Sequence, residues 1–150
     1  MRQKVIFSGV IAISLLIYLQ LFAAGPLVTM YKDPYCGCCT LWAKHLEANG
    51  FEVKIQEVQN MDQYKKTHGV PANIRSCHTA VVNGYTIEGH VPAEDIHRLL
   101  KEKPKAKGLG VPGMPTGSPG MEAGTTRQAY SVYLFDAEGK TSVFRQYSAR

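Results

Sequence analysis

Four cysteines carry most of the chemistry that this sequence can perform. Three of them lie within a single run of four residues, and the fourth, Cys77, precedes His78. Cys36 and Cys39 have the C-x-x-C spacing of a dithiol that opens and closes as a disulfide. Cys36 and Cys38 are too close in sequence for an easy disulfide, but together they can hold one metal ion. The motif therefore indicates redox chemistry, soft-metal binding, or both.

Two histidines and two methionines add further soft donors. His78 and His90 lie in short loops, and Met114 and Met121 each follow a Pro-Gly pair in a segment rich in glycine and proline. Cu(I) prefers thiolate, thioether and imidazole ligands, whereas carboxylates suit harder ions. Four thiolates and the imidazoles exceed what a single Cu(I) needs, and thiolate sulfur can bridge metals. The sequence therefore predicts a copper site, and we take more than one bound ion as the hypothesis.

These residues also have simpler interpretations. The loop histidines could only hydrogen-bond the backbone, and the methionines could only fill gaps in packing. We expect His45 and His97 to be solvated on helices, and His68 to interact with a helix C-terminus. Zinc is the nearest competitor of copper, although the adjacent Cys38 and Cys39 fit its tetrahedral structural site poorly. An iron–sulfur cluster also takes four thiolates, but an oxidising setting argues against it.

The first 26 residues predict export. Met1–Lys4 is short and basic, and no charged residue occurs between Val5 and Val28. Such a segment is a signal peptide or an N-terminal membrane anchor. The small residues before Pro26 make a poor cleavage site, so both alternatives stay open. Either one places residues 27–150 outside the cytoplasm, and we expect the periplasm, where thiols meet oxidising conditions.

Length and charge limit the remaining classes of function. A chain of 150 residues is expected to form one domain with a real core. The formal net charge of +5 includes Arg2 and Lys4 of the N-terminal segment, and no basic cluster interleaved with aromatic residues occurs. The sequence therefore predicts no nucleic-acid partner.

The body of the chain alternates predicted strands and helices. Strands are expected over residues 27–31, 51–58, 79–82 and 85–88. Helices are expected over about residues 40–49, 62–68 and 92–102. Asn83-Gly84 is a strong hairpin signal between the last two of these strands. Leu41, Trp42 and Leu46 are expected to form the buried side of the first helix.

This β-α-β-α-β-β-α order resembles the thioredoxin fold in its glutaredoxin-sized version, over about Leu27 to Glu102. In both, a cysteine motif stands at a helix N-terminus, where the helix dipole and free amides lower a thiol pKa. Thioredoxin-like enzymes place a cis-proline just before the third strand, and here that place is filled by His78, with Cys77 before it. The loop would then direct a thiol and an imidazole at the cysteine motif, which favours a metal site over a redox enzyme.

Residues 105–147 are expected to extend this core. The segment 108–121 is too rich in glycine and proline for regular structure. Residues 130–135 and 141–147 read as two strands of a closing hairpin that extends the sheet. The predicted fold class is therefore α/β and thioredoxin-like, with an added Gly/Pro/Met loop and a C-terminal β-hairpin.

Four motifs in the same order resemble the family of the copper-resistance protein CopG, small exported proteins formerly catalogued as a domain of unknown function. They are Tyr35-Cys36-Gly37-Cys38-Cys39, Ser76-Cys77-His78-Thr79, Glu88-Gly89-His90-Val91-Pro92 and the loop from Val111 to Glu122. The resemblance implies a thioredoxin-like fold that binds copper in bacterial copper homeostasis. The ligands it implies are Cys36, Cys38, Cys39, Cys77, His78 and His90, to which we add Met114 and Met121 of the loop.

Three functions stay open. The first is an envelope copper-binding protein that sequesters copper or passes it to other copper-handling proteins, cycling it between Cu(I) and Cu(II). The second is a thiol-disulfide oxidoreductase in which Cys36 is the nucleophile and Cys39 the resolving thiol, so enzymatic activity is undecided. The third is a structural protein with two disulfides, for example Cys39–Cys77 and the strained pair Cys36–Cys38. In a combined role, the thiol redox state would gate copper release.

Overall fold

The computed structural model describes residues 25–150, so all but the last two residues of the predicted signal peptide or anchor lie outside the described part. The elements, in chain order, are β1 (Leu27–Lys32), α2 (Gly37–Ala48), β2 (Glu52–Glu57), α3 (Met61–Thr67), the short 3₁₀ helix η1 (Ala72–Ile74), β3 (Thr79–Val82), β4 (Tyr85–Glu88), α4 (Ala93–Glu102), β5 (Gly108–Gly110), β6 (Tyr130–Phe135) and β7 (Thr141–Tyr147). The prediction of a mixed α/β fold is confirmed. Within residues 25–150, no helix has the length and apolar character needed to cross a bilayer.

One sheet of seven strands runs through the molecule in the order β2-β1-β3-β4-β5-β6-β7. β1 pairs with β2, and β4 with β5, in parallel, while the other neighbours are antiparallel. In this register Tyr31 lies opposite Thr79, Thr79 opposite Glu88, and Glu88 opposite Gly110. The end of β1, the start of β3 and the ends of β4 and β5 therefore meet at one edge of the sheet.

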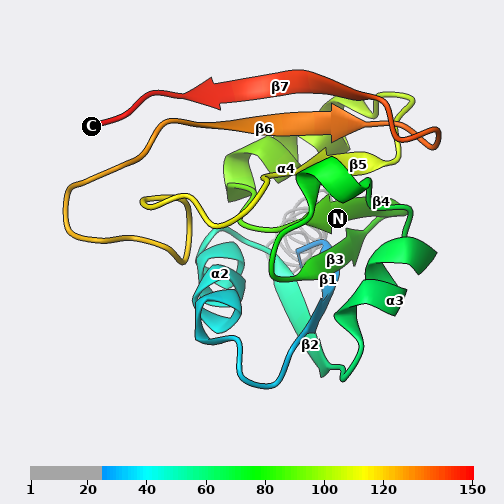
Figure 1. The fold of residues 1–150 in the computed structure, drawn as a ribbon, viewed down its shortest axis with the longest axis horizontal. Coiled ribbons are helices and arrows are strands. Elements are labelled where there is room, and N and C mark those ends of the chain that lie inside the picture. Colours follow the sequence, from blue (N-terminus) through cyan, green and yellow to red (C-terminus); the bar gives the residue numbers. More distant parts are fainter. Residues whose placement is uncertain (1–24) are drawn as a thin grey trace, which may run out of the picture.

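The helices cover both faces of this sheet, and Figure 1 shows α2 and α3 on opposite sides of the pair β1–β2. The main core cluster joins Val28 and Met30 of β1 to Trp42 of α2 and Ile96 of α4. On the other face, the ring of Tyr31 in β1 packs against Tyr64 of α3 and against His68, the C-cap residue of α3. The ring centroids are 4.9 Å and 5.3 Å away, respectively. Side chains alternate along β1, and α2 and α4 therefore share one face while α3 covers the other.

Helix α2 begins at Gly37 rather than near Thr40 as expected, because Cys36 takes the N-cap position. The cysteine run therefore forms the cap and first turn of the helix instead of a preceding loop. Leu41 was expected to be buried, yet it is 52% exposed, and the buried residues of α2 are Cys39, Trp42, Ala43 and Leu46. At about 100° per residue, these four residues share one stripe of the helix, and Leu41 falls on the opposite side.

Two further expectations are corrected. The Gly/Pro-rich segment 108–121 was expected to lack regular structure, but its first residues form β5, which is buried between β4 and β6. Glycine suits this position, because a Cβ on Gly108 would collide with the backbone of Thr86. His45 was expected to be solvated, but it is half-buried and its Nε2 accepts a hydrogen bond from the amide of Ala93, 3.1 Å away, in the first turn of α4.

Gly120 attaches the long loop between β5 and β6 to α2. It has a φ of +83°, and a Cβ there would lie 2.7 Å from the backbone nitrogen of Trp42 and 2.8 Å from the carbonyl oxygen of Cys38. Gly124, in the same loop, has a φ of +60° but open space where its Cβ would be. The close approach of backbone to backbone therefore depends on the missing side chain at Gly120.

We predict that Gly120→Ala destabilises the fold more than Gly124→Ala does. Both changes incur about 1–2 kcal/mol for a left-handed alanine, but only the change at Gly120 adds a backbone collision, of about 1–3 kcal/mol. Urea unfolding of both variants with the disulfide intact measures the difference. Equal losses in the two variants would contradict the packing of this loop on α2.

Candidate metal centre

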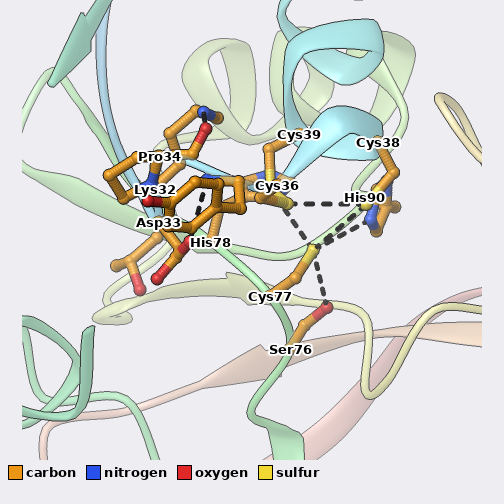
Figure 2. The surroundings of a disulfide bond; sticks show 12 residues. Lys32, Asp33, Pro34, Cys36, Cys38, Cys39, Ser76, Cys77, His78 and His90 are labelled. Atoms are coloured by element: carbon orange, nitrogen blue, oxygen red, sulfur yellow. Dashed lines mark hydrogen bonds between the residues drawn. A yellow bond between two sulfur atoms is a disulfide. The ribbon is translucent and has the colours of Figure 1, made fainter. Parts of the chain in front are cut away.

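Three cysteines surround the N-terminus of α2, as Figure 2 shows. Cys36, the N-cap residue, forms a disulfide with Cys39, while Cys38 between them keeps a free thiol. The Cys36 and Cys38 sulfurs are 3.5 Å apart. The side chain of the N-cap residue makes no hydrogen bond to the free amides of this helix end, and amides and a dipole of this kind stabilise negative charge placed beside them. The two-disulfide arrangement considered from the sequence does not occur in this structure.

Cys77 is the centre of the site (Figure 2). Its sulfur lies 4.0 Å from the Cys38 sulfur, 3.3 Å from Nδ1 of His78 and 3.1 Å from Nε2 of His90. It belongs to two sets of donors, each with all its ligand atoms within 4.8 Å of one another. One set comprises Cys36, Cys38, Cys39 and Cys77, and the other comprises Cys77, His78 and His90. The two sets meet at this one sulfur.

His90 has a fixed orientation and tautomer. Its Nδ1 lies 2.8 Å from the carbonyl oxygen of Pro119, and because a carbonyl can only accept, Nδ1 carries the proton. Nε2 is therefore the unprotonated nitrogen, and it faces Cys77. A backbone carbonyl that fixes the second nitrogen in this way is the usual support of a metal-binding histidine.

His78 is fully buried and packs on Trp42, with ring centroids 4.4 Å apart. The indole is held in turn by a hydrogen bond from its Nε1 to the Val91 carbonyl, 2.8 Å away. Within residues 25–150, Nε2 of His78 has no hydrogen-bond partner. Burial, followed by the nearby His90 and Lys65, holds the pKa of His78 well below its ordinary value. The imidazole is thus neutral, which is the form that binds a metal.

Burial also keeps the Cys77 thiol protonated. It raises the pKa of Cys77 to about 12, with the neighbouring Cys38 as the next cause. Burial lowers the pKa of His90 as well, so the Cys77 thiol can donate to a neutral His90. A metal that binds Cys77 must displace this proton, because the ligand form of cysteine is the thiolate.

The predicted methionine ligands lie in the loop that borders the site. Met114 is 52% exposed and follows Gly113, whose carbonyl accepts a hydrogen bond from the Ser76 hydroxyl. Met121 is partly buried and follows Gly120, which packs on the first turns of α2. The structure thus connects both loop positions to the site through their neighbours, and ligation by either thioether stays a prediction.

Several supporting residues could not be inferred from the sequence. The Pro119 carbonyl and the Trp42 indole orient the two histidines, and Glu88 holds the backbone of Ser76 with Oε1 2.6 Å from its amide. Backbone carbonyls leave no trace in residue types. Glu88 is the one for which the sequence held a signal, because it lies in the Glu88-Gly89-His90 motif, two residues before a candidate ligand.

The fold and the site together define a class of protein: a small α/β protein with clustered cysteine and histidine donors, able to hold a soft metal, at one edge of its sheet. A family profile described as "Protein of unknown function, DUF411" matches residues 74–121. Two solved structures, named "Copper resistance protein copG- Form 2" and "Form 1", share 46% sequence identity with the chain, with TM-scores of 0.79 and 0.78. The match covers 82% and 81% of this chain, and 98% and 97% of theirs. Comparison with curated proteins gave no match.

The chain therefore belongs to the CopG-like family. The resemblance inferred from the four motifs is confirmed. The donor clusters of the structure and the copper-resistance relatives fit a copper-binding role for the chain.

The disulfide pairing predicts the reactivity of each thiol. In metal-free, oxidised protein, alkylation under denaturing conditions should modify two cysteines, Cys38 and Cys77. After reduction all four should react. Peptide mapping by mass spectrometry checks both results, and the Cys36→Ser variant should expose Cys39 without reduction. Alkylation of Cys36 or Cys39 in the oxidised protein would contradict the Cys36–Cys39 bond.

Proposed function

We propose that this chain is a periplasmic copper-binding protein of copper homeostasis, which binds Cu(I) as its cargo and takes up more than one ion. The observation that carries the proposal is the Cys77 sulfur, which is shared by a set of four cysteine sulfurs and a set with two imidazoles. A thiolate can bridge two metal ions, so one shared sulfur suits adjacent copper ions.

The chemistry of the donors supports copper over harder metals. Aspartate and glutamate could have joined these groups, yet both sets within residues 25–150 contain only cysteine and histidine. Thiolate and neutral imidazole are the donors that Cu(I) prefers, whereas Mg²⁺, Ca²⁺ and Mn²⁺ prefer oxygen. Zinc accepts the same donors, but the sequence-adjacent pair Cys38–Cys39 suits its single tetrahedral site poorly.

The arrangement of strands supports the thioredoxin-like core that we expected. β1 lies between the parallel β2 and the antiparallel β3, and a cysteine motif begins the helix after β1. In this proposal the ligands are Cys36, Cys38, Cys39, Cys77, His78 and His90, with Met114 and Met121 binding copper at the border of the site. The chain would act in the periplasm, free or tethered by residues 1–26, and exchange copper with other envelope proteins.

Anaerobic Cu(I) titration of the reduced protein from Leu27 onward tests the proposal. We predict several tightly bound copper ions, and a larger loss of stoichiometry in Cys77→Ser than in Cys36→Ser, because only Cys77 belongs to both donor sets. Elemental analysis counts the metal. His97→Gln is the matched control, because His97 is an exposed histidine outside both sets. Met114→Leu and Met121→Leu test the two thioethers in the same titration.

Two results would contradict this proposal. A stoichiometry that never exceeds one would exclude the shared sulfur as a bridge. Absence of tight binding, together with rapid exchange of the dithiol with glutathione, would instead support the oxidoreductase alternative.

The Cys36–Cys39 disulfide is the observation that favours this second function. Cys36 is partly exposed, and Cys39 is buried in the first turn of α2. In an exchange reaction the Cys36 thiolate would attack a disulfide and release one thiol. The Cys39 thiolate would then attack Cys36 and release the second. The same reaction would gate copper, because the closed disulfide removes two thiolates from the larger donor set.

Gating predicts that oxidation releases copper. Oxidised glutathione added to the loaded protein should close the Cys36–Cys39 bond, reduce the glutathione to two thiols and lower the bound copper. The variant Cys36→Ser/Cys39→Ala should bind less copper than the unmodified protein. The amount should be the same with and without oxidised glutathione, because the variant lacks both thiols that form the disulfide. Elemental analysis after gel filtration measures the retained metal. Full retention of copper in the oxidised protein would exclude gating.

A further inference from the structure

A charged side chain is buried directly beneath the metal centre. Glu88, the last residue of β4, has no exposed surface, and Lys65 of α3 is only 5% exposed. Lys65 Nζ donates to Glu88 Oε1 over 2.6 Å and to the Thr79 hydroxyl over 3.3 Å. Neither charge belongs to either set of metal donors.

The remaining contacts of Glu88 are with the two residues that flank the Cys77-His78 pair. Its Oε1 accepts from the Ser76 amide over 2.6 Å, and its Oε2 accepts from the Thr79 hydroxyl over 2.6 Å. One carboxylate thus bonds to the chain just before Cys77 and just after His78. Because both oxygens act only as acceptors, this pattern suits a carboxylate ion paired with Lys65.

The carboxylate holds this loop from the side away from the metal. Thr79 and Glu88 are cross-strand partners, and their side chains meet Lys65 on the face covered by α3. His78 packs on Trp42 of α2, on the opposite face. The contacts of Glu88 therefore constrain the backbone of the loop and leave its donor atoms free. Residues 25–150 contain no cis peptide bond, so no cis-proline shapes the loop.

We propose that Glu88 is a positioning residue of the metal centre, which clamps Ser76 and Thr79 so that Cys77 and His78 face the cysteines of α2. Lys65 supports it by pairing with its charge. The effect on copper rests on the proposed function, whereas the effect on the loop does not.

Stability alone is a poor reason for such a pair. Replacing a buried ion pair by apolar residues of similar volume is often neutral or stabilising. The pair instead supplies directed hydrogen bonds to a loop whose amide and hydroxyl would otherwise be unsatisfied. Residues that orient ligands in this way commonly change metal affinity about 10–100-fold when they are replaced.

The test compares two double variants. Lys65→Met/Glu88→Leu removes both charges and both acceptors, whereas Lys65→Met/Glu88→Gln removes the charges but keeps an acceptor for the Ser76 amide. Removing both charges together avoids leaving one buried and unpaired. Leu99→Ala is the control, because it destabilises the fold from the buried side of α4 and removes no hydrogen bond to the loop.

Two measurements decide the result. Hydrogen exchange of the amides from Ser76 to Thr79 should quicken in the leucine variant and stay near that of the unmodified protein in the glutamine variant. Cu(I) affinity should fall about 10–100-fold in the leucine variant, with the Cys77 and His78 contributions weakened in X-ray absorption spectra. The glutamine variant should recover most of this affinity.

The proposal is overturned if loop exchange in the leucine variant matches that of the unmodified protein, or if Leu99→Ala accelerates it equally. It is also overturned if loop exchange quickens while Cu(I) affinity and the spectra stay unchanged, because the clamp would then be structural only. If the unmodified protein binds no copper, the proposed function fails. In that case the exchange data still decide whether Glu88 holds the loop.

Discussion

The antiparallel pairing of β1 with β3 is the constraint on which the site depends. Tyr31 opposite Thr79 places the end of one strand beside the start of the other. The cysteine run follows the first strand and the Cys77-His78 pair precedes the second, so residues about 40 positions apart meet at one edge. The pairing of Thr79 with Glu88 then adds His90 to the same place. A shift of one residue in this register would turn these side chains to the wrong faces.

Three donors of the site, Cys77, His78 and His90, carry no charge in the absence of metal. His78 and His90 are neutral because burial lowers the pKa of each, and Cys77 is protonated because burial raises its pKa. Ionised groups in such surroundings would be costly without partners. A soft cation can supply the missing charge, because it binds thiolates and releases their protons. The empty and loaded forms are then both compatible with a buried centre.

Much of this organisation could be predicted from the sequence. Alternating apolar residues and the Asn83-Gly84 turn predicted the central strands. Residue chemistry identified the four cysteines and two histidines that the structure brings together. The expectations from the sequence that proved wrong concern contacts between distant segments of the chain. β5 has too few residues to carry a periodic signal, and its pairing comes from buried neighbours. The role of His45 follows from a partner amide in another element, which residue types do not reveal.

The direction of β1 has a consequence for any tether. The strand begins at Leu27, directly after the predicted anchor, and its six residues lead to Lys32 beside the cysteines. At about 3.3 Å per residue, the five steps from Leu27 to Lys32 separate the two ends of the strand by about 17 Å. If residues 1–26 stay in the bilayer, the segment that joins the anchor to the cysteines would be a strand of the sheet and not a flexible linker. The donors of a membrane-held form would then move only with the whole domain, because the first strand fixes the anchor end of the chain to the sheet.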